Sequence, residues 1–157
     1  MKFLLSSLTF FIFFFLDLQA VKEINSFGVI LKYPVNVRIG PDTFYRIAFV
    51  LNSDDVSIPF SVRYQTGDWY FIETFNKKSG WVKINLVKEN KSYCIAKRDL
   101  QVLFRPNLDF QHKITLGKLK MGGVFLCKNY PRSEFVRTKI KGVKNGWVLR
   151  KDVFGLK

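Results

Sequence analysis

The chain has 157 residues, with 26 basic and 12 acidic side chains and a net charge of +14. From Val21 onward it is long enough for one ordinary domain or for two very small ones. It contains one histidine and two cysteines, and it has no C-x-x-C motif and no cluster of acidic ligands. This composition argues against a metal site, and we expect no cofactor.

Residues 1–20 have the pattern of a signal peptide. Lys2 gives a positive start, residues 3–16 are almost wholly apolar, and Ala20 is the small residue that a signal peptidase needs. The alternative is a retained membrane anchor, but a spanning helix needs about 20 apolar residues and this run stops at Asp17. We therefore expect cleavage after Ala20 and a periplasmic or secreted protein.

The rest of the chain consists of short β-branched and aromatic runs between Gly, Pro, Asn and Asp, which indicates an all-β fold. Strands are predicted, in chain order, at residues 35–39, 56–64, 69–74 and 80–83, and then at 100–104, 123–127, 135–140 and 146–149. Gly40 is expected to allow a sharp exit from the first of these strands. The polar stretch 87–93 is the predicted linker.

The two halves of the chain repeat each other, which predicts a tandem duplication. Residues 35–42 (VNVRIGPD) align with residues 100–107 (LQVLFRPN) at an offset of 65. The G-W-V triplet at 80–82 aligns with the G-W-V triplet at 146–148 at an offset of 66. A slip of one residue over the whole unit fits a single insertion in a turn.

Positive charge is concentrated in the second half. Residues 21–90 carry 9 basic and 7 acidic side chains, net +2, whereas residues 91–157 carry 16 basic and 4 acidic side chains, net +12. An anionic partner would therefore meet the second half, although a solvated basic face explains the same charge equally well. The candidate residues for contact with an anionic surface are Lys118, Lys120, Lys139, Lys141 and Lys144.

Both cysteines, Cys94 and Cys127, fall in the basic half. In an oxidising compartment two cysteines within one small domain can form a disulfide, so this pair is a disulfide candidate. The alternative, a Cys127–His112 thiol–imidazole dyad, requires positioned partners that the surrounding turn and basic neighbours do not suggest. We expect no catalytic activity.

Three motifs stand in order in the first half: V-N-V-R-I-G-P at 35–41, D-W at 68–69 and G-W-V at 80–82. In that order they resemble bacterial SH3-like domains, and the resemblance covers about residues 28–87. A divergent second copy spans residues 94–157. With the signal peptide, the whole chain resembles exported two-domain SH3-like proteins of alphaproteobacteria. Relatives of that type often carry a cysteine pair in the second domain; Cys127 stands at the first position and Val136 at the second.

The resemblance implies an all-β fold of two tandem small SH3-like β-barrels. Closed barrels hide their sheet edges, and Trp81, Trp147 and Phe135 are expected to fill their cores. The resemblance also implies a groove beside the loop after the first strand, where aromatic faces take an extended peptide. The candidate ligand-binding residues there are Arg38, Phe44, Tyr45, Arg46, Tyr64 and Tyr70. For any single tyrosine, covering the end of the barrel is the competing interpretation.

Two functions remain open at this level. The first is a non-catalytic binding module for peptidoglycan peptide or for a protein partner in the cell envelope. The second is an electrostatic adaptor whose basic half sits on phospholipid or lipopolysaccharide. Nucleic acid would also suit the charge, but export argues against it.

Overall fold

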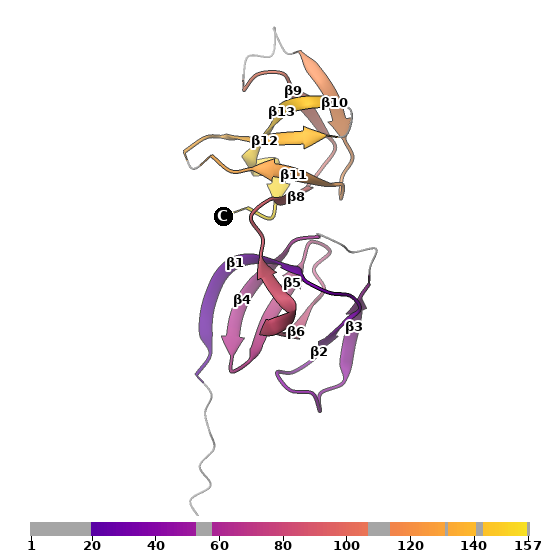
Figure 1. Ribbon diagram of the computed structural model, residues 1–157, viewed down its shortest axis with the longest axis vertical. Coiled ribbons are helices and arrows are strands. Elements are labelled where there is room, and N and C mark those ends of the chain that lie inside the picture. Colours follow the sequence, from indigo (N-terminus) through magenta and orange to yellow (C-terminus); the bar gives the residue numbers. More distant parts are fainter. Residues whose placement is uncertain (1–19, 53–57, 107–113, 131, 141–142, 157) are drawn as a thin grey trace, which may run out of the picture.

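The computed structural model of the protein describes residues 20–52, 58–106, 114–130, 132–140 and 143–156. These residues form two seven-stranded antiparallel sheets, placed one after the other along the long axis of the molecule (Figure 1). Apart from the single 3-10 turns η2 (Ile84–Leu86) and η4 (Arg150–Asp152), the described residues contain no helix. The all-β prediction is therefore confirmed. No described segment is a helix long and apolar enough to cross a membrane.

The two sheets have the same strand order. The first is ordered β3-β2-β6-β5-β4-β1-β7 and the second β10-β9-β13-β12-β11-β8-β14. The strands of the first sheet are β1 (Lys22–Ile30), β2 (Val35–Arg38), β3 (Ile47–Leu51), β4 (Phe60–Thr66), β5 (Trp69–Thr74), β6 (Ser79–Lys83) and β7 (Val87–Glu89). Those of the second are β8 (Tyr93–Ala96), β9 (Leu100–Leu103), β10 (Thr115–Leu119), β11 (Val124–Lys128), β12 (Phe135–Ile140), β13 (Val143–Leu149) and β14 (Val153–Phe154).

The predicted linker at 87–93 is wrong. Val87–Glu89 forms β7, which pairs with the last three residues of β1, and Tyr93 already begins β8. Only residues 90–92 join the sheets. The polar sequence V-K-E forms a strand here because β1 offers it an edge on which to pair, and strand formation depends on such a partner more than on composition.

The core of the first sheet lies on the inner face of β2, β4, β5 and β6. Its fully or almost fully buried side chains include Val37, Val62, Ile72 and Val82. Alternation along each strand places these residues on one face, and burying an aliphatic side chain of this size contributes about 1.5–3 kcal/mol. Apart from Phe60, the buried residues of this core are β-branched and suit a pleated surface.

The two G-W-V tryptophans do not fill the cores, contrary to the prediction. In each triplet the valine is the inner residue, with Val82 0% and Val148 1% exposed. Because successive side chains alternate between faces, Trp81 and Trp147 lie on the outer face, where both are half-buried. Phe135 is buried as predicted.

The second core is cross-linked. Cys94 on β8 and Cys127 on β11 form a disulfide with an S–S distance of 2.02 Å and a Cα–Cα distance of 5.9 Å. Both residues belong to a buried cluster with Val102, Val136 and Val148. The structure thus joins the two cysteines that the sequence offered as a candidate pair, and it does so inside the core.

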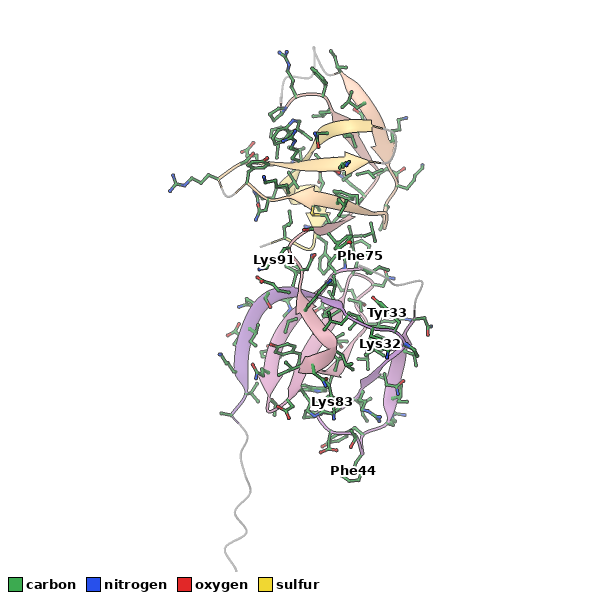
Figure 2. All side chains as sticks on the ribbon, in the orientation of Figure 1. Lys32, Tyr33, Phe44, Phe75, Lys83 and Lys91 are labelled. Atoms are coloured by element: carbon green, nitrogen blue, oxygen red, sulfur yellow. A yellow bond between two sulfur atoms is a disulfide. The ribbon has the colours of Figure 1, made fainter. Side chains whose placement is uncertain are left out.

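The two sheets meet through β14 and the short connection after β7. The ring of Phe154 lies 5.0 Å from that of Phe27 and 5.8 Å from that of Phe75, measured between centroids. Asn90 donates from its Nδ2 atom to the carbonyls of Tyr93 and Gly155, at 2.7 and 2.8 Å. Figure 2 shows Phe75 at this junction.

Candidate functional site

An aromatic row crosses the outer face of the first sheet. The strand register pairs Tyr64 with Phe71, Phe71 with Trp81, and Trp81 with Arg38, so the row runs over β4, β5, β6 and β2. The ring centroids lie 6.0 Å apart for Tyr64 and Phe71, and 5.3 Å apart for Phe71 and Trp81. Directly opposed residues of antiparallel strands share a face, so these four side chains stand in one line across the strands.

A β-bulge places Tyr64 in the row. The register of β4 against β5 shifts between Val62 and Tyr64. Val62 is buried, and strict alternation would turn Tyr64 inward as well; the extra residue at the bulge, Arg63, returns Tyr64 to the outer face, where it is 43% exposed. Bulges re-aim side chains in this way near functional sites.

Arg38 ends the row and fixes the adjacent loop. Its Nη1 atom donates a 2.7 Å hydrogen bond to the carbonyl of Tyr45. The Tyr45 ring lies against Gly40, where an added Cβ would come within 2.5 Å of ring atoms. The described glycines with positive φ are Gly67, Gly122 and Gly155, so the close Tyr45 ring, and not a left-handed backbone, explains the glycine at position 40.

The loop also contains a local acid. The Asp42 carboxylate accepts hydrogen bonds from the Phe44 N–H and from the Thr43 hydroxyl, both at 3.1 Å. The Phe44 N–H is the main cause that lowers the pKa of Asp42 below its ordinary value, because it stabilises the charged form. These bonds order the turn and leave the Phe44 side chain 95% exposed at its tip, at the end of the sheet away from the junction (Figure 2).

The six residues predicted for the groove separate in the structure. Arg38 and Tyr64 lie in the aromatic row. Tyr45 lies in the neighbouring loop, where its backbone carbonyl accepts the hydrogen bond from Arg38. Phe44 and Arg46 are exposed on that loop, outside the row. Tyr70 lies on the other face from Tyr64: it pairs with the buried Val82, shares the inner face and packs against the core.

Sequence reasoning missed two members of the row, Phe71 and Trp81. Residues 70–72 read Y-F-I, three apolar side chains in succession, and such a run does not indicate which residue faces outward. Trp81 was assigned, with Trp147, to the core of a small closed barrel. The sequence did contain a signal for the outward position of Trp81. Its neighbours Gly80 and Val82, a glycine without a side chain and a β-branched residue, suit the packed side of a strand.

The predicted cations of the second half do not form one group. Lys118 lies on the edge strand β10, whereas Lys139 lies on β12, with β9 and β13 between them. The Nζ atom of Lys120 pairs with the carboxylate of Asp99 at 2.9 Å. Lys141 and His112 lie outside the described residues, as does the side chain of Lys144.

Within the described ranges, no group of three or more His, Cys, Asp or Glu side chains is placed to hold a metal ion. The disulfide occupies the sulfur of Cys127, which removes the thiolate that the alternative dyad would need.

Comparison with known proteins finds only distant structural likeness. No protein-family model and no curated protein matches the sequence. Among solved structures, the chain is similar to NlpC2 from Trichomonas vaginalis, with 10% identity and a TM-score of 0.38, over 85% of this chain and 49% of that one. It is likewise similar to NlpC1 from Trichomonas vaginalis, with 10% identity and a TM-score of 0.38, over 84% and 46%. The chain spans about half the length of these proteins, and likeness at this level assigns neither family nor activity.

Proposed function

We propose that the protein is an exported, non-catalytic binding module of the cell envelope that holds an extended peptide against the aromatic row of its first sheet. The row of Tyr64, Phe71 and Trp81, ending in Arg38, is the observation that carries the proposal. Aromatic faces stack on stiff extended chains, and a guanidinium adds charge-assisted hydrogen bonds to a carboxylate or carbonyl at one end.

The spacing of the row suits an extended chain. Neighbouring ring centroids lie 5.3 and 6.0 Å apart, and an extended peptide advances about 3.3 Å per residue, so successive rings would meet roughly every second side chain. The rings stand on paired strands, so little conformational entropy is lost when a ligand binds.

The wider assignment rests on the repeated architecture. Two bacterial SH3-like barrels in tandem are supported by the shared strand order of the two sheets, by the V-N-V-R motif on β2 and by the G-W-V motif on the equivalent strands β6 and β13. The apolar segment at residues 3–16 and the Cys94–Cys127 disulfide support export to an oxidising compartment. In that setting the ligand is peptidoglycan peptide or an extended segment of an envelope protein.

The proposal is tested by retention on purified sacculi. Protein beginning at Val21 is mixed with sacculi in high-salt buffer, which screens charge-driven binding. We expect wild-type protein and a Tyr64→Phe variant to be retained, because both keep the aromatic face. Tyr64→Ala should bind at least about tenfold more weakly, as loss of an aromatic anchor does.

The matched control is Leu31→Ala, which removes an apolar side chain that is 54% exposed outside the row. It should bind as the wild type does. Equal binding of Tyr64→Ala and wild type would overturn the role of the row. Retention of wild-type protein only at low salt would replace this proposal with the electrostatic adaptor.

A further inference from the structure

The second sheet repeats the row with different side chains. Its register pairs Lys128 with Arg137, Arg137 with Trp147, and Trp147 with Leu103, over β11, β12, β13 and β9. The same strand order makes these positions the equivalents of Tyr64, Phe71, Trp81 and Arg38 in the first sheet. The tryptophan is kept, but the two aromatic positions beside it carry cations in the second copy.

These cations surround a hollow. It has a volume of about 300 Å³ and is lined by Lys128, Arg137 and Lys139 together with polar groups of Ser92 and Asn145. None of the described residues that line it is acidic. The ion pairs of the described residues use other cations, at Arg63, Lys77, Lys91, Arg98 and Lys120.

The pairing of Lys128 with Arg137 destabilises the second sheet when no anion is bound. Lys128 and Arg137 stand directly opposite each other on neighbouring strands, and like charges in that position destabilise a sheet. A bound anion would reverse the sign of this interaction, because each cation would then face a negative group.

Two aromatic rings lie beside the cations of the hollow, outside its lining, and are held in place. The Tyr130 ring lies 5.7 Å from the Trp147 ring, and the Nζ atom of Lys128 lies 5.6 Å from the Tyr130 centroid. Arg150 fixes this loop, since its guanidinium donates to the carbonyls of Tyr130 and Ser133. Cations beside rigid rings provide both charge and a flat apolar face.

We propose that this hollow and the adjoining rings bind an anionic glycan, with a carboxylate or phosphate group in the hollow between Lys128 and Arg137. A neighbouring sugar ring of the same chain would lie against Trp147 and Tyr130, beside these two cations. The volume is at the lower end of the range for ligand pockets, which suits one charged group on a chain. A bilayer presents a broad flat surface, which a small hollow does not complement. The site is independent of the aromatic row on the first sheet.

The test follows amide NMR shifts and binding isotherms of protein beginning at Val21. The probes are oligogalacturonate as a carboxylate glycan, tripolyphosphate as a free phosphate chain, dextran oligomers as a neutral glycan, and vesicles of equal parts phosphatidylglycerol and phosphatidylcholine. Oligogalacturonate should bind and shift the amides of β11 and β12, tripolyphosphate should bind there more weakly, and dextran should not bind.

The decisive variant is Lys128→Gln/Arg137→Gln. It should bind oligogalacturonate at least about tenfold more weakly, yet melt at the same or a higher temperature because the like-charge pair is gone. Its matched control is Lys88→Gln/Lys118→Gln, which removes the same charge from exposed positions on β7 and β10. The control should keep its affinity.

Three results would overturn the proposal. Equal losses in the two double variants would show diffuse attraction by net charge. Binding to the vesicles that needs Lys128 and Arg137, with none to oligogalacturonate, would show a lipid site. No binding of either carboxylate or phosphate probe would show that the hollow has no anionic ligand of this class.

Discussion

At the scale of single residues, the glycine of each G-W-V triplet is explained by close strand approach. A Cβ on Gly80 would lie 2.6 Å from the carbonyl oxygen of Arg38 and 2.7 Å from Val37. A Cβ on Gly146 would lie 2.3 Å from Val102, at the equivalent place in the second sheet. No side chain fits there unless the neighbouring strand moves.

Gly80→Ala should therefore lower the free energy of unfolding by about 1–3 kcal/mol, the usual effect of overpacking a well-packed interior. Urea denaturation of the wild type and the variant measures this difference. Ser79→Ala is the control, because the exposed Ser79 side chain should tolerate the change within about 0.5 kcal/mol. Equal stability of Gly80→Ala and wild type would contradict the close approach.

The carboxylate of Asp99 gives a prediction about pH. It accepts hydrogen bonds from the Met121 N–H and from the Nζ atom of Lys120, both at 2.9 Å. The Met121 N–H is the larger cause and Lys120 the next, and together they lower the pKa of Asp99. A folded-state pKa below the unfolded one stabilises the protein above the unfolded pKa, about 3.9, and this stabilisation is lost as pH falls through the folded pKa.

Lys120→Gln should move the pKa of Asp99 part of the way back toward its ordinary value, because the Met121 hydrogen bond remains. The measurement is a titration of the Asp99 carboxyl carbon by NMR. Lys118→Gln changes a charge that acts on Asp99 only through space, so its effect should be smaller. A larger effect at Lys118 than at Lys120 would contradict this ranking.

At the scale of elements, much of the sheet pattern could be predicted from the sequence, but not its edges. The eight predicted strands correspond to β2, β4, β5, β6, β9, β11, β12 and β13; the bounds of β5 and β12 are as predicted and the other six have shifted ends. These are strands whose apolar residues form runs between turn residues. Six of the described strands were missed: β1, β3, β7, β8, β10 and β14. Four of these, β3, β7, β10 and β14, are the edge strands of the two sheets. Short strands such as β7 and β14 form because they pair with a neighbour, more than because of their local composition.

The candidate site was harder to predict than the fold. The V-N-V-R motif led to Arg38, but Tyr64 enters the row only because a bulge shifts its register, and Phe71 is hidden in an apolar run. In the second half, net charge indicated an anionic partner without locating it. Lys128 and Arg137 become neighbours through cross-strand register, which no local pattern reveals.

The disulfide holds two strands of the second sheet together. It links β8 to β11 across a sequence separation of 33, and in the chain-entropy model a loop of that length stabilises the fold by about 3–4 kcal/mol. Cys94→Ala/Cys127→Ala should lose about that much in urea denaturation. Reductant should destabilise the wild type but leave the double variant unchanged; a reductant effect on the variant would point to a cause other than the disulfide.

At the scale of the whole molecule, the contacts at the junction indicate that the two sheets are held together. The Phe154 side chain from the second sheet lies between Phe27 and Phe75 of the first. The backbone N–H of Asn90 donates to the carbonyl of Phe27, while its side chain bonds Tyr93 and Gly155. One residue thus bonds to both sheets, and an aromatic cluster covers the same junction.

Phe154→Ala should loosen this junction because it removes both ring contacts. Truncating a buried phenylalanine costs about 3–5 kcal/mol, and the half-buried Phe154 should cost less than that. Small-angle scattering should then give a larger radius of gyration, and thermal unfolding should separate into two transitions in place of one. Phe104→Ala, which truncates a ring that is 48% exposed away from the junction, should leave the scattering and the cooperativity unchanged.

If Phe154→Ala kept the wild-type radius and a single transition, the polar contacts of Asn90 would suffice to couple the sheets. Adding Asn90→Ala to Phe154→Ala decides between these accounts: a double variant that still unfolds in one transition would show that the sheets are coupled by contacts outside this junction.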